Sequence, residues 1–281
     1  MSNAPAHLDA MLLIRAYEQQ LIAARQPGHC SSLGQEACAV GVVAALDARD
    51  LLISNHRNAG HLLARGVAPA QLLAEAIAGS ALHMTAQSLG VVLTSPRTGA
   101  GLGVATGVAL AQKLGARPQG ITAVFFGDGA ACQGVFHEAV NLAVTWRLPV
   151  LFVCENNQWQ GDVHRRGTMP GEFIADWVQG HGLAVEVVDG NDVQAVHLAA
   201  TEAVAQIRSS GRPALLELVT YRQRGHCEPD EPDCVCGSEH AQWLRRDPIL
   251  REARRLQLSP DELAHREARA RERLGGSPPC R

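Results

Sequence analysis

The sequence of 281 residues predicts an α/β fold, in which a parallel sheet is covered by helices on both faces. Two observations support this prediction. Short β-rich runs alternate along the chain with segments of helical periodicity, and most of these runs are apolar throughout instead of alternating between apolar and polar residues. Strands of that kind are typical of a sheet that is buried on both faces. With 46% hydrophobic residues, the chain is long and apolar enough to bury a substantial core.

The expected elements follow one another along the chain. Strands are expected at 51–54, 121–126, 150–154, 184–188 and 214–220. Helices are expected at 40–46, 70–77, 104–114, from a turn at 127–129 to about 146, and at 191–209. Asn191 or Asp192 is available to cap the last of these helices, and Gly211 follows its end. The stretch 79–103 has little periodicity. We expect one domain over residues 1–281, with a charged helical tail from about residue 239.

Composition argues against several classes of function. The chain has 25 basic and 28 acidic residues, so a net charge of −3 gives no reason to expect nucleic acid or an anionic membrane as a partner. No apolar run approaches the roughly 18 residues that cross a bilayer. The N-terminal residues lack the basic start and apolar block of a signal peptide. We expect a soluble, cytoplasmic protein.

The cysteines raise the question of a zinc site. Cys227, Cys234 and Cys236 cluster near His226 and His240, but their spacing is C-x6-C-x-C, and the chain has no C-x2-C pair. We favour reduced thiols in a loop for this cluster, and leave metal binding open.

Two glycine-rich stretches compete as phosphate-binding elements. Residues 99–107, GAGLGVATG, approach the dinucleotide fingerprint, but no apolar strand leads into them and no acidic residue lies about 20 residues later. We interpret them as the start of a close-packed helix. Residues 125–131, FFGDGAA, close an expected strand and open an expected helix. That context suits a phosphate site, because glycine lets the backbone approach the ligand and the helix start presents amide groups.

Polar side chains follow two successive strands of the predicted sheet. Asp128 ends one strand, and Asn157 ends the next. The 26 residues between Gly129 and Asn156 are about what a helix and a strand require. Ligands of open α/β sheets bind at the carboxyl ends of the strands. Carboxylate and amide oxygens are hard ligands, so the pattern predicts a Mg²⁺ and diphosphate site there.

A GDG followed at this distance by NN resembles the thiamine diphosphate-binding motif. More narrowly, the chain resembles the α subunit of the decarboxylating component of 2-oxo acid dehydrogenases, of the pyruvate and acetoin type, in the run GDGAACQGVFHEAVNLAVTWRLPVLFVCENNQW. Further blocks match in order, namely LGQEA at 33–37, SNHR at 54–57, VDGND at 188–192, LVTYR at 218–222 and DPI at 247–249. The resemblance implies a Rossmann-like thiamine diphosphate-binding fold that holds this cofactor with Mg²⁺.

The resemblance also implies which residues hold the cofactor. The metal would be bound by Asp128, Asn157 and the main-chain carbonyl of Trp159. Groups that would contact the diphosphate come from Gly129 and Ala130, and from Arg57, whose guanidinium fork suits phosphate oxygens.

Three histidines and a cysteine are implied near the reacting groups. His56 takes the place of a tyrosine beside the cofactor. His226 aligns with a histidine that reaches the diphosphate and the substrate, where an imidazole can stabilise charge or pass a proton. Cys30 falls where the family has a substrate-side histidine, and the adjacent His29 is the possible substitute. Cys227 replaces a serine that is phosphorylated in mitochondrial members. The residue that supports the bent cofactor cannot be placed.

The resemblance implies a divided active site. In this family a separate β subunit supplies the glutamate that activates the cofactor, and two α and two β subunits form a heterotetramer. The expected reaction decarboxylates a small, pyruvate-like 2-oxo acid and transfers the acyl unit to a lipoyl group on an acyltransferase or carrier domain. Two alternatives stay open, namely a transketolase-like transfer of a two-carbon ketol unit from a ketose phosphate, and a non-catalytic paralogue that keeps the fold.

Overall fold

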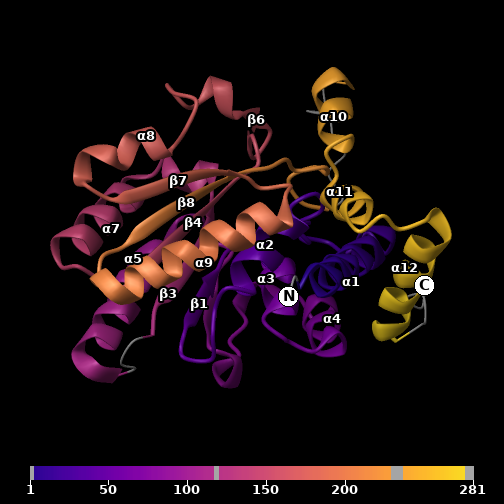
Figure 1. Cartoon of the computed structure of the whole chain (residues 1–281), viewed down its shortest axis with the longest axis horizontal. Coiled ribbons are helices and arrows are strands. Elements are labelled where there is room, and N and C mark those ends of the chain that lie inside the picture. The colour runs from indigo at the N-terminus through magenta and orange to yellow at the C-terminus, as the bar shows by residue number, and fades with distance from the viewer. Residues whose placement is uncertain (1–2, 117–119, 229–236, 276–281) are drawn as a thin grey trace.

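A parallel sheet lies at the centre of the molecule (Figure 1). The computed structural model describes residues 3–116, 120–228 and 237–275. The strands of this sheet are β1 (Leu51–Ser54), β2 (Val91–Thr94), β3 (Thr122–Gly127), β4 (Val150–Asn156), β7 (Ala184–Asp189) and β8 (Ala214–Val219). Their order across the sheet is β2-β1-β3-β4-β8-β7. Every pair of neighbours is parallel, so all the strands end at the same edge.

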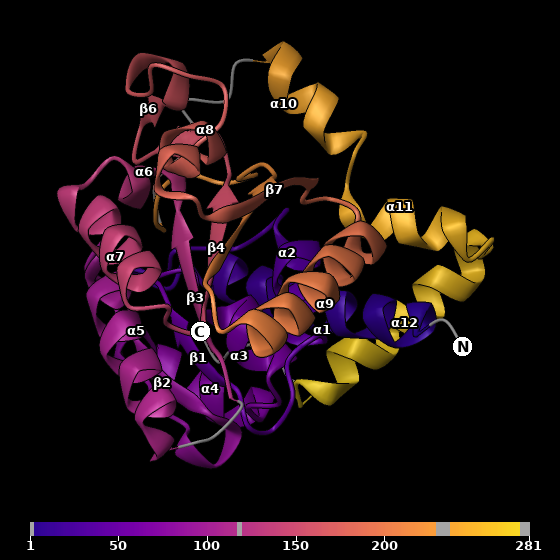
Figure 2. The same cartoon turned by 60° about the vertical axis from the view of Figure 1, so that its left-hand side comes forward.

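Different helices cover the two faces of the sheet (Figure 2). One face packs against α1 (Ala4–Ala23), α2 (Glu36–Val43), α3 (Ala59–Ala64) and α9 (Val193–Ser210). The other packs against α5 (Ala100–Ala111) and α7 (Gly134–Thr145). Strand β3 contributes side chains to the packing on both faces, because successive side chains of a strand point to opposite faces. Its residues Phe125 and Phe126 are an example. The first is buried in one core and the second in the other. The predicted fold class is confirmed.

The remaining elements are short or peripheral. They are α4 (Pro69–Ile77), α6 (Asp128–Ala131), α8 (Ala175–Val178), α10 (Gly237–Leu244), α11 (Pro248–Arg255), α12 (Pro260–Arg273) and the antiparallel pair β5 (Trp159–Gln160) and β6 (Val163–His164). Single turns of 3-10 or π type lie at Ala81–His83, Gln87–Leu89, Gln112–Ala116, Arg165–Gly167 and Gln179–His181. In the described part of the chain, no helix has both the length and the apolar character needed to cross a membrane.

The C-terminal helices pack on the chain's beginning and on α9. Helix α12 lies beside α1 (Figure 1), where Arg266 pairs with Asp9 at 2.6 Å. Arg255 of α11 pairs with Asp192 at 2.6 Å. The Asp192 side chain also accepts hydrogen bonds from the amides of Gln194 and Ala195, and so caps α9 as predicted.

Several parts of the predicted secondary structure need correction, among them the helix expected at 40–46, which lies at 36–43 as α2. Strand β2 lies inside the stretch 79–103, where four residues at a sheet edge are too few to give a periodic signal. Helix α5 begins at Ala100 instead of residue 104, directly after Gly99, which has a φ of 76° that only glycine adopts readily. The expected turn at 127–129 is already the start of α6, and a break at Cys132 separates it from α7.

Candidate active site

A cavity of about 240 Å³ opens at the carboxyl ends of β1, β3 and β4. Its wall is built from five parts of the chain, namely 54–57, 95–102, 125–130, 155–161 and His226. The residues that the sequence predicts to hold the cofactor all contribute to this wall: His56, Arg57, Asp128, Gly129, Ala130, Asn157, Trp159 and His226. Residues from four separate stretches of sequence therefore meet at one site.

Asp128 carries a buried carboxylate with an unsatisfied oxygen. It follows the last residue of β3, is 1% exposed, and lines the cavity. Its Oδ2 atom has no hydrogen-bond partner among the described residues. Burial raises the pKa of the Asp128 carboxyl to about 7, because the charged form is poorly solvated there. An unpaired buried carboxylate of this kind is stabilised by a bound cation.

Asn157 is held in a fixed orientation beside Asp128's strand. Its amide nitrogen donates to Oε1 of Gln35 at 3.0 Å, and its Oδ1 accepts from the main-chain amide of Trp159 at 3.2 Å. These two bonds settle which end of the amide is the oxygen. The parallel register of β3 and β4, in which Gly127 lies opposite Glu155, brings Asp128 and Asn157 to the same edge. The donor set therefore fits a hard cation such as Mg²⁺.

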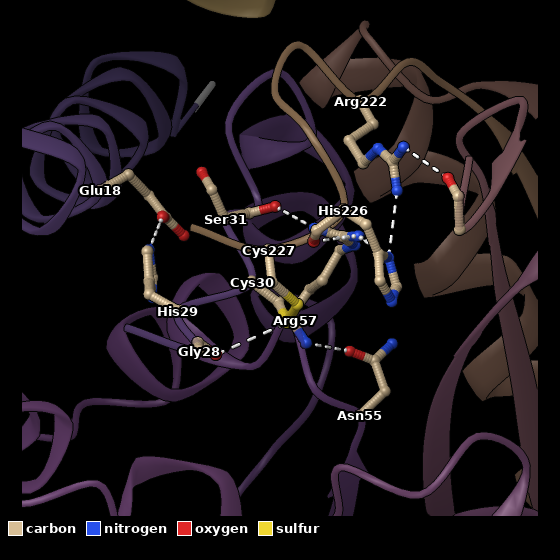
Figure 3. The surroundings of a disulfide bond; sticks show 11 residues. Glu18, Gly28, His29, Cys30, Ser31, Asn55, Arg57, Arg222, His226 and Cys227 are labelled. Carbon is tan, nitrogen blue, oxygen red and sulfur yellow. Dashed lines mark hydrogen bonds and ion pairs between the residues drawn. A yellow bond between two sulfur atoms is a disulfide. The ribbon is translucent and has the colours of Figure 1, made fainter. Parts of the chain in front are cut away.

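Arg57 and His226 form a basic wall of the cavity, and Arg222 contacts His226 from behind this wall (Figure 3). Nη2 of Arg57 lies 3.2 Å from Nδ1 of His226 and donates to the main-chain oxygen of the same residue at 3.0 Å. Nη1 of Arg222 lies 3.2 Å from the same Nδ1 atom. Burial, and then the nearby charge of Arg222, lower the pKa of Arg57 to about 9. Two buried guanidinium groups at such close range favour a bound anion.

Arg222 is a site residue that the sequence did not predict. It is 1% exposed, and its Nη2 donates at 2.7 Å to the main-chain oxygen of Gly161, a residue of the cavity wall. The only feature of the sequence that pointed to Arg222 was its place at the end of the family block LVTYR. A conformation that turns its side chain back toward β5 and β6 could not be inferred from that block.

His56 lies in the turn after β1 and Glu155 lies near the end of β4, and both line the cavity. Burial and the neighbouring Arg57 lower the pKa of His56 to about 3, so the ring is neutral at ordinary pH. Glu155 lies 3.1 Å from Nε2 of His61, whose Nδ1 is 2.7 Å from the hydroxyl oxygen of Ser54. Through this chain of polar contacts the ends of β1 and β4 are fixed to each other.

The two predicted substrate-side residues, Cys30 and His29, do not line the cavity. Nε2 of His29 lies 2.6 Å from a carboxylate oxygen of Glu18, which is fully buried. Cys30 forms a disulfide with Cys227, and their Cα atoms are 4.2 Å apart.

The disulfide corrects the prediction of reduced thiols in the cluster around Cys227. The two cysteines are 197 residues apart, so no local spacing could reveal the pair. Cys234 and Cys236 lie outside the described residues. Within 3–116, 120–228 and 237–275, no group of three or more His, Cys, Asp or Glu side chains is arranged to hold a metal ion.

One protein family matches almost the whole chain. The model of the dehydrogenase E1 component family covers residues 10–270. The α subunit of acetoin:2,6-dichlorophenolindophenol oxidoreductase of Bacillus subtilis is 37% identical over 226 residues, which cover 77% of this chain and 68% of the relative. The chain belongs to the dehydrogenase E1 component family.

Other α subunits of this family show a similar likeness. The pyruvate dehydrogenase E1 component subunit α of Porphyra purpurea is 36% identical over 232 residues, covering 77% of this chain and 67% of the relative. The corresponding subunit of Zymomonas mobilis is 36% identical over 239 residues, which cover 78% of this chain and 66% of the relative. The family depends on thiamine diphosphate, so the predicted enzyme class and cofactor are confirmed. An α subunit of this kind also implies a β subunit as its partner.

Proposed function

We propose that this chain decarboxylates a small 2-oxo acid of the pyruvate type, together with a β subunit, and passes the acyl unit to a lipoyl group on an acyltransferase or carrier domain. The observation that carries the proposal is the buried, unsatisfied Oδ2 atom of Asp128 in a cavity that is also lined by the basic residues Arg57 and His226. A cation and an anion are both stabilised in such a cavity, and a metal-bound diphosphate provides both. The names of the pyruvate dehydrogenase relatives support the donor class.

Asp128, Asn157 and the main-chain oxygen of Trp159 would hold Mg²⁺ in this proposal. All three residues line the cavity. The main chain of Gly129 and Ala130 would contact the diphosphate, since both residues line the cavity at the start of α6. Thiamine diphosphate, when bound, supplies carbanion chemistry at a 2-oxo carbonyl group. The protein's part is to position the diphosphate and to exclude water.

Arg57 and Arg222 would neutralise the diphosphate and also set the protonation of His226. Nδ1 of this histidine lies within 3.2 Å of both guanidinium groups, which only donate hydrogen bonds. Nδ1 therefore accepts, and the proton of the ring lies on Nε2. His226 would then offer an N–H group to the substrate side, where it can stabilise negative charge or transfer a proton.

The β subunit would complete the site. We infer that it supplies the glutamate that activates the cofactor, in an assembly of two α and two β subunits. The described cavity offers one buried carboxylate besides Asp128, Glu155, and this residue is already engaged with His61. An acidic group from a partner is therefore needed opposite the phosphate-binding edge.

A donor screen tests the proposed function. The α chain and its β subunit are incubated with thiamine diphosphate and Mg²⁺, and release of carbon dioxide from pyruvate is measured beside release of aldose phosphate from a ketose phosphate. We expect carbon dioxide, and no product when Asp128→Ala replaces the wild-type chain. A Glu202→Ala chain, altered at an exposed acidic residue of α9, is the matched control. Aldose phosphate release would favour the transketolase-like alternative, and activity that survives Asp128→Ala would contradict the proposal.

A further inference from the structure

We propose that Cys30 and Cys227 are a reversible redox modification site, at which a disulfide fixes the segment carrying His226 against the cavity. The proposal deepens the proposed function and rests on it for its effect on thiamine diphosphate binding. Formation of the disulfide itself depends only on the two cysteines and their surroundings.

The disulfide joins two loop segments that already run side by side. Residues 24–35 connect α1 with α2, and residues 220–228 follow β8. The amide of Gly28 donates to the main-chain oxygen of Glu228 at 3.1 Å. The amide of Glu228 donates to the main-chain oxygen of His29 at 2.8 Å. These two backbone bonds bring the adjacent residues Cys30 and Cys227 together (Figure 3). Glu18 of α1 also holds the first segment, because it lies 2.6 Å from Nε2 of His29 and accepts a hydrogen bond from the amide of Ser32.

The same two segments meet at the basic wall of the cavity. Arg57 donates to the main-chain oxygen of Ser31 at 2.7 Å and to that of His226 at 3.0 Å. Ser31 is the neighbour of Cys30 in sequence, and His226 is the neighbour of Cys227. The Arg57 guanidinium group and the disulfide therefore link the same two segments, at positions that are one residue apart in each segment. Breaking the disulfide loosens the segments at the point where Arg57 and His226 face the diphosphate position.

Exposure distinguishes Cys227 from the fully buried Cys38 and Cys154, and its disulfide distinguishes it from the exposed Cys132. Cys227 is partly exposed and can meet an oxidant, whereas Cys30 is buried beside it. Cys38 and Cys154 are fully buried, and burial raises the pKa of both thiols well above the usual value, which leaves them unreactive. Cys132 is exposed and free. It provides a natural control, because it meets the same oxidant but is not part of the disulfide.

The redox step needs a two-electron oxidant, for which we name a peroxide. The Cys227 thiolate attacks an oxygen of hydrogen peroxide, the O–O bond breaks, and a sulfenic acid and one water form once the proton is counted. The Cys30 thiol then attacks the sulfenic sulfur, the S–S bond forms, and a second water leaves. In total two thiols lose two protons and two electrons, and the peroxide gains both. A small dithiol reverses the step by thiol–disulfide exchange.

We expect the oxidised protein to bind thiamine diphosphate more tightly than the reduced protein. A covalent link lowers the conformational entropy of the unliganded loop, so less ordering remains to be done on binding. If the disulfide spares the ordering of about one residue, the affinity changes about tenfold.

Peptide mapping tests the site itself. The full chain is treated with hydrogen peroxide or with dithiothreitol, free thiols are alkylated, and the protein is digested with trypsin and with proteases specific for Glu and Asp. Trypsin and the Glu-specific protease isolate Cys30 in residues 26–36, and trypsin and the Asp-specific protease isolate Cys227 in residues 225–229. We expect these two peptides to be linked after peroxide and separate after dithiothreitol. Two alkylated peptides after peroxide treatment would overturn the proposal.

Binding and hydrogen exchange test the consequence. Titration of thiamine diphosphate with Mg²⁺ into the α–β complex is expected to give about tenfold tighter binding for the oxidised form. The difference should vanish in Cys227→Ser and persist in Cys132→Ser. Amide exchange in 222–228, measured without cofactor, should be slower in the oxidised chain. Equal affinities and equal exchange in both forms, or loss of the difference in Cys132→Ser, would overturn the proposal. Slower exchange without any cofactor binding would support the redox site and contradict the proposed function.

Discussion

The acidic and the basic walls of the cavity are built in different ways. Asp128 and Asn157 follow the last residues of two adjacent parallel strands, and the register of β3 and β4 places them. Arg222, His226 and Cys227 lie in a loop whose position depends on bonds to residues far away in the sequence, among them Arg57. The metal side is therefore a property of the sheet, and the phosphate side is a property of loop–loop contacts. The first should tolerate changes elsewhere in the molecule, whereas the second should respond to them.

The largest effect is expected from Asp128→Asn, which removes the anionic ligand but keeps the shape of the side chain. We expect binding of thiamine diphosphate with Mg²⁺ to the α–β complex to weaken by a factor of about 100 or more, since a charged partner in a buried site contributes several kcal/mol. Calorimetric titration measures the affinity. Wild-type affinity in this variant would show that the metal side does not depend on the sheet-end carboxylate.

Arg222→Gln tests the basic wall with a smaller expected effect. Hydrogen bonds between charged groups contribute about 1.5–3 kcal/mol, so the affinity for thiamine diphosphate should fall by about 10- to 100-fold. Arg212→Gln, at an exposed residue just before β8, is the matched control and should bind as the wild type does. Circular dichroism of both variants checks that the fold is kept. An unchanged affinity in a folded Arg222→Gln chain would remove this residue from the phosphate side.

His56→Tyr is expected to change the acid sensitivity of the fold. The pKa of His56 is about 3 in the folded chain, because of burial and the nearby charge of Arg57, against 6.5 when solvated. Between these values the unfolded chain binds a proton that the folded chain does not, so the free energy of unfolding decreases as the pH falls through this window. Well below pH 3 the histidine is protonated in both the folded and the unfolded chain, and the free energy of unfolding falls no further from this cause.

The variant should therefore lose less stability on acidification. From pH 6.5 to pH 5 we expect the wild type to lose about 2 kcal/mol more than His56→Tyr does. Urea unfolding at the two pH values measures the difference, with the exposed His83→Tyr as control. If His56→Tyr and the wild type lose equal stability, the buried neutral histidine does not contribute.

Asp192→Ala should leave the cavity unaffected. This residue caps α9 and pairs with Arg255, and neither residue lines the cavity. Loss of the cap should lower the free energy of unfolding by about 1–2 kcal/mol. Calorimetric titration should give wild-type affinity for thiamine diphosphate. A clear loss of affinity would mean that the loop side of the cavity is sensitive even to distant changes in packing.

The contrast between the walls also explains what the sequence could predict. The apolar runs predict β3 and β4, so the sequence alone places Asp128 and Asn157 at one edge of the sheet. His226 and Arg57 could be assigned only through the family resemblance, since each alone is an ordinary basic residue in a polar segment. The cavity geometry then adds Arg222, which the resemblance marked only as part of a longer block.

The errors share one physical cause. β2 is short and lies at an edge, so its place depends on pairing with β1 and not on its own pattern. The disulfide between Cys30 and Cys227 depends on two backbone hydrogen bonds between two loops, and the two cysteines are 197 residues apart in the sequence. Periodicity and motif spacing report local structure, and contacts of such long range lie beyond them.

Electron paramagnetic resonance of Mn²⁺, used in place of Mg²⁺, tests the central claim most directly, because Mn²⁺ prefers the same oxygen ligands. The α–β complex is titrated with Mn²⁺ in the presence and absence of thiamine diphosphate, and the signal of free Mn²⁺ is recorded. We predict one tightly bound Mn²⁺ per α chain in the presence of the diphosphate, lost in Asp128→Asn and retained in Glu202→Ala. Equal Mn²⁺ binding by the Asp128→Asn and wild-type complexes would contradict the assignment of the metal site to the ends of β3 and β4.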